Sequence, residues 1–291
     1  MRIGLSDDAV APLLGRHDAA VAARRRGATL FAVALAAALA LAALVAEVDP
    51  VALARNFHRL PDYIGRILRL ENGAPVWTDP VEWMWGLDHW LVLMGETVLI
   101  AYVGTITGAV GGFFLCFLSA TNMVRSTWLG MGAKRLLEFC RTVPELVFAL
   151  VFVQAFGLGP LPGILALAIH TTGALGKLFA EVVENIDMKP VDGTISCGAT
   201  RVQAIRYAVL PQVMSNFTSY ALLRFEINVR GAAVMGFVGA GGIGQDLIEA
   251  IRKFYYSDVS ALLLLIIVSV MAIDLVTERI RHALLGWERA T

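Results

Sequence analysis

The sequence predicts an all-α integral membrane protein with about six transmembrane helices. Hydrophobic residues make up 57% of the 291 residues, whereas charged residues make up only 16%. Because soluble domains contain about 25% charged residues, this chain carries more apolar surface than water solvates well. Several uncharged runs also reach the roughly 20 residues that an α-helix needs to cross a bilayer. No series of alternating ten-residue segments of the kind that builds a membrane barrel is present.

The first apolar run is Ala28–Ala46, which contains no charged residue and follows Arg24, Arg25 and Arg26. Its length and its late start distinguish it from a signal peptide, whose apolar core is shorter. We therefore expect a retained membrane helix. Since basic residues stay on the cytoplasmic side, the arginines place the N-terminus in the cytoplasm.

The next segment, up to His89, combines an amphipathic pattern with a tryptophan cluster. Apolar residues recur there at helical spacing: Leu53, Phe57, Leu60, Ile64 and Ile67. Four tryptophans follow: Trp77, Trp83, Trp85 and Trp90. An amphipathic helix of this kind lies at a membrane surface, and tryptophans gather where lipid meets water. Residues 1–89 are thus expected to hold a tail, one membrane helix and an interfacial segment.

Five further apolar spans complete the predicted bundle. They are Trp90–Leu118, Leu136–Phe156, Pro162–Val183, Gln212–Val229 and Val259–Val276. The basic residues that link or follow them on one side are Arg125, Lys134, Arg135, Lys189, Arg201, Arg206, Arg279, Arg281 and Arg289. With the first helix running outward, all of these would be cytoplasmic, so charge bias and span count agree. The prediction is a multi-pass protein of the inner membrane with both termini in the cytoplasm.

The segment Cys197–Val213 is polar and basic although apolar spans flank it. Arg201 and Arg206 would each cost about 3 kcal/mol at mid-bilayer, so the segment lies outside the lipid. Gly198 permits a tight turn, and Pro211 suits the first turn of a helix. An apolar face is expected from Val191, Ile195, Val202 and Ile205. A short cytoplasmic helix with such a face predicts a partner protein.

This segment resembles the coupling segment of ABC importer permeases, whose pattern is Glu-Ala-Ala, three residues, Gly, nine residues, Ile, one residue, Leu-Pro. Here the spacing is complete, although the Glu-Ala-Ala triplet and the isoleucine are replaced. The resemblance implies a coupling segment at residues 187–211 that contacts a separate ATPase. The residues it assigns to coupling are Asp192, Gly193, Thr194, Gly198, Ala199, Arg201, Leu210 and Pro211.

A narrower resemblance extends over roughly Trp90–Arg281. The stretches "RTVPELVFALVFVQAFGLGPLPGILALAIHTTGALGKLFAE" and "YALLRFEINVRGAAVMGFVGAGGIG" resemble permease subunits of phosphonate importers. That resemblance implies a type I importer fold over residues 90–285 and a homodimer. It also implies a cytoplasmic ATPase dimer that holds ATP and Mg²⁺, and an extracytoplasmic protein that delivers phosphonate, phosphate or phosphite.

Four polar residues lie inside or beside the fifth span: Arg224, Glu226, Asn228 and Arg230. Charged groups in a membrane are costly and usually face a bundle interior or a wet cavity. One interpretation is structural, because Glu226 and Arg230 have the i,i+4 spacing of an ion pair. The other is functional, because guanidinium groups suit anionic substrates. Arg141 and Glu145 have the same spacing, and there an internal pair is the favoured interpretation.

Glycines mark two further places. Gly104, Gly108 and Gly112 form a small-residue stripe that lets helices approach closely, within the subunit or across a dimer. "GAGGIG", with Gly239, Gly241, Gly242 and Gly244, matches a dinucleotide-binding pattern but follows a membrane helix rather than a strand. We expect instead a turn near the outer face, on the substrate path. Contact between the backbone amides of this turn and an anion is the less favoured interpretation.

Several functions are excluded or ranked lower. A net charge of zero argues against nucleic-acid binding. The chain lacks a P-loop, so ATP binds elsewhere and no cofactor is expected here. Three scattered cysteines and five scattered histidines suggest neither a disulfide framework nor a metal site, and an embedded enzyme would need a convergent catalytic set. A secondary transporter or channel without an ATPase, or a permease for another small oxyanion, stays open.

Overall fold

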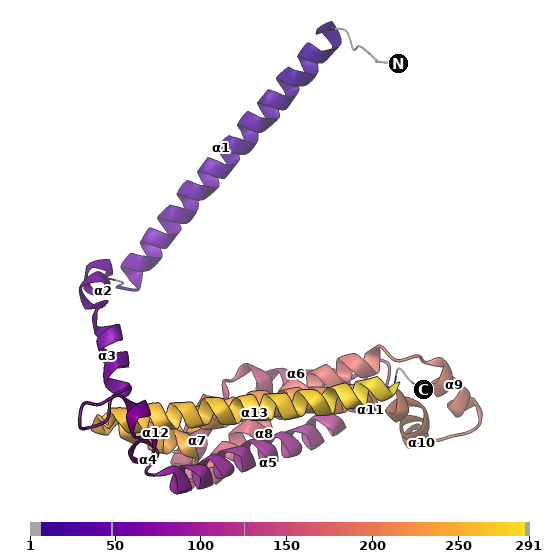
Figure 1. Cartoon of the computed structure of the whole chain (residues 1–291). Coiled ribbons are helices and arrows are strands. Elements are labelled where there is room, and N and C mark those ends of the chain that lie inside the picture. The colour runs from indigo at the N-terminus through magenta and orange to yellow at the C-terminus, as the bar shows by residue number, and fades with distance from the viewer. Residues whose placement is uncertain (1–6, 48, 125, 289–291) are drawn as a thin grey trace. The chain divides into compact units, whose positions relative to one another are not determined.

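The computed structural model describes residues 7–47, 49–124 and 126–288, and regular structure there is helical apart from one isolated bridge between Arg69 and Pro75. Two compact units divide the chain, Met1–Ile64 and Gly65–Thr291. Arg125 and Arg289, which contribute to the predicted charge bias, lie outside the described residues. The first unit begins with α1 and the second holds the helix bundle (Figure 1).

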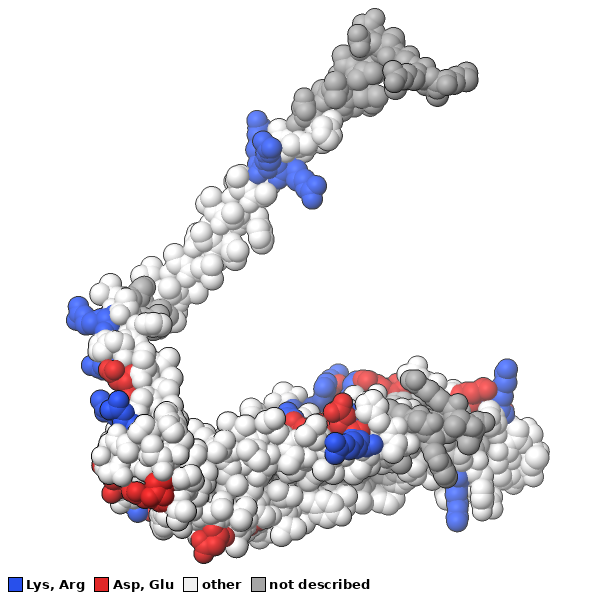
Figure 2. Space-filling view, viewed as in Figure 1, with Lys and Arg blue, Asp and Glu red and all other residues white. Residues whose placement is uncertain are grey.

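The first unit contains α1 (Asp7–Val45) and α2 (Pro50–Asn56), and α3 (Arg59–Ile67) begins in it. In α1, Ala20–Val45 is long and apolar enough to cross a membrane, as predicted. The part of this stretch after Arg26 is uncharged, and Figure 2 shows it between two groups of basic side chains. Instead of one amphipathic helix, α2 and α3 are separate. Pro61 lacks the amide that would bond Phe57, which accounts for the break after Asn56.

The segment 68–89 carries a short 3₁₀ turn, η1 (Val76–Thr78), and α4 (Pro80–Trp83), and it packs onto the start of the last helix. Trp83 Nε1 donates to Ser260 Oγ at 2.9 Å, and Trp85 Nε1 donates to Asp258 Oδ1 at 3.1 Å. Trp90 is buried in the core. The predicted tryptophan belt is therefore partly internal, with Trp77 and Trp85 exposed.

The bundle of the second unit is built from long helices joined by short ones. Its elements are α5 (Leu87–Ser119), α6 (Thr127–Thr142), α7 (Glu145–Phe156), α8 (Pro160–Glu184), α9 (Lys189–Ser196), α10 (Arg201–Ala204), the π-helical turn η2 (Ile205–Val209), α11 (Leu210–Met235), the 3₁₀ turn η3 (Gly236–Val238), α12 (Ile243–Lys253) and α13 (Tyr256–Glu288). Among the described residues, four helices are long and apolar enough to cross a membrane, or five when α11 and α12 count as one bent span.

The third predicted span, Leu136–Phe156, is not a continuous helix. It is divided between α6 and α7 at Val143 and Pro144. Proline has no amide hydrogen and disfavours helical backbone in the residue before it. Val143 accordingly adopts an extended conformation, with φ −73° and ψ 123°. The apolar part of this third span is thus α7, a helix of 12 residues.

The α5–α8 contact forms the centre of the bundle. A Cβ atom on Gly104 would lie 2.7 Å from the Cβ of Leu167, and one on Gly108 would lie 2.6 Å from the Cβ of Thr171. On Gly112 it would lie 2.8 Å from a backbone nitrogen of α8. The predicted glycine stripe therefore brings two helices of the same subunit into backbone contact.

Two apolar clusters fill the rest of the bundle. One joins α5, α11, α12 and α13 and contains Ile100, Met235, Ile243 and Leu262 among others. The second lies where α5, α8 and α11 meet the short helices α9–η2, and there Phe179 stacks on Phe217 with ring centroids 4.0 Å apart. Val191 and Val209 belong to this second cluster. The coupling segment is thus packed against the bundle rather than attached only at its ends.

Candidate translocation path and coupling segment

The polar residues of α11 face different surroundings. Asn228 and Glu226 are buried, with exposed fractions of 1% and 9%, and Arg224 is partly buried. The Arg230 side chain, in contrast, is 51% exposed. The helix therefore presents one group of polar side chains to its neighbours in the bundle and one arginine to the surface.

An inner polar network connects α5, α7, α8 and α11. Its members are Thr105, Glu145, His170, Thr171, Arg224 and Asn228. The Arg224 guanidinium donates to His170 Nδ1, and His170 Nε2 lies 3.6 Å from Glu145 Oε2. Asn228 Nδ2 donates to Thr105 Oγ1 at 2.8 Å and to Thr171 Oγ1 at 2.9 Å.

The amide oxygen of Asn228 is buried and accepts no hydrogen bond from the described residues. A buried acceptor without a partner carries a desolvation cost, and an ordered water or a donor from another molecule removes it. The network thus offers one guanidinium and one free acceptor inside the bundle.

Neither ion pair predicted from i,i+4 spacing is present. Arg230 Nη2 lies 2.9 Å from both carboxylate oxygens of Asp274 on α13, and Glu226 accepts from Thr277 Oγ1. The reason is that α13 lies against α11 and supplies nearer partners. Glu145 contacts His170 instead of Arg141, because the break at Pro144 takes α7 out of line with α6.

The glycine sequence forms the predicted turn. Gly239, Gly241 and Gly242 have φ angles of +84°, +82° and +76°, a region that L-residues with side chains rarely adopt. The bend between α11, with η3, and α12 measures 47°. Ile243 N donates to Thr97 Oγ1 at 2.9 Å, which fixes the start of α12 against α5.

Gly244 has a packing role. A Cβ atom at Gly244 would lie 1.8 Å from the backbone oxygen of Ala233. The α7–α8 turn also contacts this region, since Gly159 N donates to Gly239 O at 3.0 Å. The glycines thus permit a turn and close approach; contact with an anion stays a prediction.

The predicted coupling segment is a helical hairpin made of α9, α10 and η2. Gly198, with φ +86°, makes the turn, and Thr200 caps α10 in a reciprocal capping box with Gln203. Asp192, Gly193 and Thr194 lie in α9, Ala199 lies in the turn and Arg201 begins α10. Leu210 and Pro211 begin α11 as predicted.

The predicted apolar face of this hairpin is divided. Val191 is buried in the second cluster, whereas Ile195 and Val202 are 49% and 74% exposed. Tyr207 is 66% exposed as well. The predicted face is confirmed in part: Val191, Ile195 and Ile205 line one cavity, whereas Val202 lies apart from them and is exposed.

Some residues that build these sites were missed from the sequence. His170 and Thr171 interrupt the apolar run of α8, and Asp274 is the one carboxylate within Val259–Val276. Each is a polar group inside an apolar span, which is the signal that singled out Arg224. Gln212 gave no such signal. Its amide accepts from Asp187 N at 3.1 Å and donates to Asp187 O at 3.2 Å, which ties the two ends of the hairpin together.

Residues 112–285 match the family described as "Binding-protein-dependent transport system inner membrane component". The chain belongs to this family. The permease is thus a multi-pass inner-membrane subunit of a binding-protein-dependent transport system. The family, together with the phosphite, phosphate and phosphonate permeases among its relatives, confirms the expectation of a phosphonate-type ABC importer permease, a transport subunit rather than an enzyme.

Two curated relatives extend the comparison. The permease is 40% identical over 189 residues to the phosphite transport system permease protein PtxC of Stutzerimonas stutzeri, covering 65% of this chain and 69% of that protein. It is 38% identical over 199 residues to the phosphate-import permease protein PhnE of Mycolicibacterium smegmatis, covering 68% of this chain and 37% of that protein.

Solved structures share the fold. The permease resembles a chain of the inward-facing MetNI methionine ABC transporter with a TM-score of 0.58 and 20% identity, over 71% of this chain and 98% of that chain. A bacterial ABC transporter for alginate gives a TM-score of 0.58 at 13% identity, over 82% and 95% of the two chains. At these identities the likeness concerns the fold alone, and it confirms the predicted all-α permease architecture.

Proposed function

We propose that the permease forms, as a homodimer, the translocation path of an ATP-driven importer for phosphonate or a related oxyanion such as phosphite or phosphate. The observation that supports this choice of transported oxyanion is the 40% identity with a phosphite transport permease over 189 residues. The inner polar network supports it, because the Arg224 guanidinium suits a phosphorus oxyanion.

The proposed path runs along α11 and the glycine turn. Its residues are Arg224, Glu226, Asn228, Arg230, Gly239, Gly241, Gly242 and Gly244. Arg230 and Asp274 support a second copy beside α11 and α13, because both side chains are partly exposed among apolar neighbours such as Ile227 and Met271. A charged pair at this depth is costly against lipid, and a second subunit or a wet path between subunits avoids that cost.

The proposed mechanism is alternating access driven through residues 187–211. With both termini in the cytoplasm, as the arginines before the apolar stretch of α1 and those near the end of α13 favour, the hairpin faces the ATPase. Exposed Ile195, Val202 and Tyr207 offer apolar contacts to it. Asp192, Gly193, Thr194, Gly198, Ala199, Arg201, Leu210 and Pro211 hold or shape this hairpin. ATP and Mg²⁺ bind the ATPase, and this chain carries no cofactor of its own.

Growth on a sole phosphorus source tests the cargo. Cells without other uptake systems would receive the permease with its ATPase and binding protein, and would be supplied with methylphosphonate, phosphite or phosphate. We expect growth on at least one of these, and loss of growth when the P-loop lysine of the ATPase is replaced. Growth that survives this replacement would instead support a channel or secondary transporter.

Two differently tagged copies test the dimer. When both are expressed together, we expect one tag to recover the other from detergent, along with the ATPase. Recovery of only one tag, with the ATPase present, would contradict the homodimer and would favour pairing with a different permease chain.

A further inference from the structure

We propose that Glu184 is a positioning residue that ties the coupling segment to α5 and α6, so that a push from the ATPase moves these helices together with α8 and α11. Only α8 and α11 continue directly into the coupling segment. The proposal goes beyond the proposed function and rests on it in one respect, namely that the hairpin contacts the ATPase.

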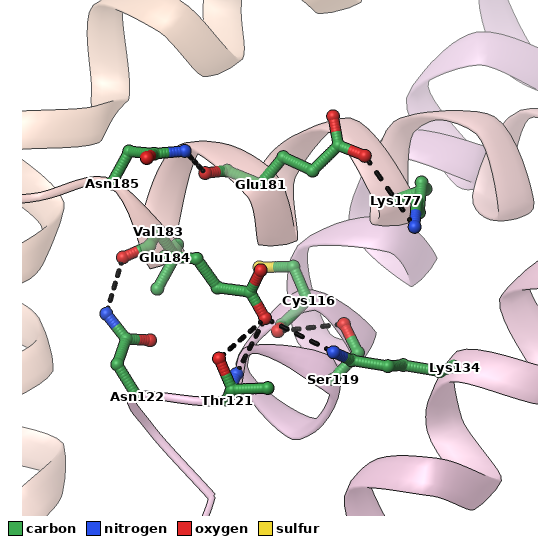
Figure 3. A network of polar contacts seen from close by, with 10 residues as sticks. All are labelled: Cys116, Ser119, Thr121, Asn122, Lys134, Lys177, Glu181, Val183, Glu184 and Asn185. Atoms are coloured by element: carbon green, nitrogen blue, oxygen red, sulfur yellow. Dashed lines mark hydrogen bonds and ion pairs between the residues drawn. The ribbon is translucent and has the colours of Figure 1, made fainter.

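Glu184 is the last residue of α8, and its side chain leaves that helix to meet two others (Figure 3). One carboxylate oxygen accepts from Thr121 N at 2.8 Å, from Thr121 Oγ1 at 3.0 Å and from Lys134 Nζ at 3.3 Å. Thr121 lies in the loop after α5, next to its C-cap residue Ala120, and Lys134 lies in α6. A single side chain therefore joins three elements immediately before the coupling segment begins.

The loop after α5 also contacts the hairpin itself. Asn122 Nδ2 donates to Val183 O at 2.7 Å and lies 3.7 Å from the Met188 sulfur, next to the start of α9. Arg201 Nη1, in α10, lies 3.5 Å from Met123 O. Glu184, Asn122 and Arg201 thus form a line of polar contacts from α8 along this loop to the hairpin.

Behind this line the loop and the hairpin are packed only in part, through the second apolar cluster. A cavity of about 430 Å³ lies between them, with apolar side chains such as Phe117, Leu129, Val191 and Ile205 in its wall. Close packing transmits displacement well, whereas a void does not. The polar contacts at the rim therefore link the hairpin to the α5–α6 region in addition to the apolar contacts of the second cluster.

The chemistry of this link predicts that different substitutions at position 184 will weaken it to different degrees. The Glu184 and Lys134 side chains are 28% and 40% exposed, so their ion pair contributes little alone. The bond from Thr121 N needs an acceptor at position 184, and a charged acceptor is stronger than a neutral one. Glutamine keeps an acceptor, alanine removes it, and lysine replaces it with a donor.

Glu181 provides a matched control on the same helix. Its carboxylate lies 3.6 Å from Lys177, one turn earlier in α8, and so makes its ion pair within α8 (Figure 3). Glu181→Ala removes a carboxylate from the same helix, more exposed than Glu184 (53% against 28%), without touching the link to Thr121.

The first measurement is the number of ATP molecules hydrolysed per phosphite imported by the complete complex in proteoliposomes. For Glu184→Ala we expect this ratio to rise about three- to tenfold, the range of effects seen along coupling networks. Glu184→Gln should fall between Glu184→Ala and the wild-type chain, and Glu181→Ala should match the wild type. The exchange Glu184→Lys with Lys134→Glu should not restore coupling, since lysine cannot accept from Thr121 N.

The second measurement does not depend on the cargo. Cys197 is exposed in the hairpin, and Trp128→Cys adds a second exposed site in α6, in a chain with Cys116→Ala and Cys140→Ala. Spin labels at both sites report the distance from hairpin to α6 with and without ATP. We expect a constant distance with Glu184 and a shift of about 2 Å with Glu184→Ala, the scale of helix movements in such transitions.

The outcomes separate the two proposals. An unchanged ratio and an unchanged distance in Glu184→Ala would overturn the role of Glu184, as would a parallel loss of complex, hydrolysis and import at constant ratio. A wild-type complex that imports none of the three oxyanions would overturn the cargo, and the label distance would still decide the role of Glu184.

Discussion

The glycines of the bundle centre and those of the coupling segment occupy opposite environments. At Gly108, Gly112 and Gly244 a Cβ atom would overlap backbone or a neighbouring side chain. At Gly193 and Gly198 it would meet nothing within 4 Å. Gly198 is needed because its φ angle is positive, whereas the central glycines are needed because a side chain there would clash with neighbouring atoms. The central glycines therefore allow close packing between helices, whereas Gly198 allows a backbone conformation in a place where a side chain would have space.

Gly244→Ala tests this contrast most severely. Its Cβ would lie 1.8 Å from Ala233 O, and because the clash is with backbone, relaxation must move α11 or α12. We expect a loss of at least about 3 kcal/mol of stability, which thermal unfolding and the yield of monodisperse protein in detergent would report. Gly193→Ala is the control, and it should unfold at the wild-type temperature or above. Equal yields of the two variants would contradict the packing account.

Arg224→Ala tests whether the bundle centre also selects cargo. The guanidinium is held by His170 and Thr171 and is the strongest candidate for an oxyanion contact. We expect import of phosphite to fall at least about tenfold, since charge-assisted bonds are the strong ones. The complex should still assemble. Arg252→Ala, on the exposed side of α12, should import normally.

Arg230→Ala sharpens the same question at the surface of α11. This variant leaves the Asp274 carboxylate without its bidentate partner, and we expect import to be abolished while the dimer still assembles. The double variant Arg230→Ala with Asp274→Ala separates the two interpretations. Restored import would show that the pair only positions α11 and α13, with a coupling energy of about 1 kcal/mol. Continued loss would assign Arg230 to the path.

Gly198→Ala should have the smallest effect on assembly. The position has ample space, so only the left-handed backbone conformation is strained, at about 1 kcal/mol. We expect the complex to form with a slightly lower unfolding temperature and a reduced import rate. Gly198→Asn should be milder, because asparagine adopts this conformation more readily. A loss as large as that of Gly244→Ala would remove the distinction between the two kinds of glycine.

The fold class followed from the sequence because apolar runs in α1, α5, α8 and α13 are long and continuous. The turns at Gly198 and Gly239–Gly242 followed from the freedom of glycine, and Pro211 marked the start of α11. The break at Pro144 was underestimated, since hydrophobicity alone continues through it.

The partners of the charged residues could not be predicted from the sequence. Spacing along one helix suggested Glu226 with Arg230, yet the position of α13 decides the matter by offering Asp274 and Thr277. The link through Glu184 was hidden for the same reason, because Thr121 lies 63 positions away in the chain. Local periodicity predicts helices well, but contacts between distant elements depend on packing that no single segment encodes.

The bond from Gly159 N to Gly239 O joins two turns that are far apart in the sequence and lie together in the fold. A Cβ atom at Gly241 would also lie 3.1 Å from Pro160 N, so the two turns share one tight space. Directed evolution that seeks new cargo by randomising either turn alone will discard most variants as misassembled. Libraries that vary residues 157–160 and 239–242 jointly give compensating pairs a chance to survive.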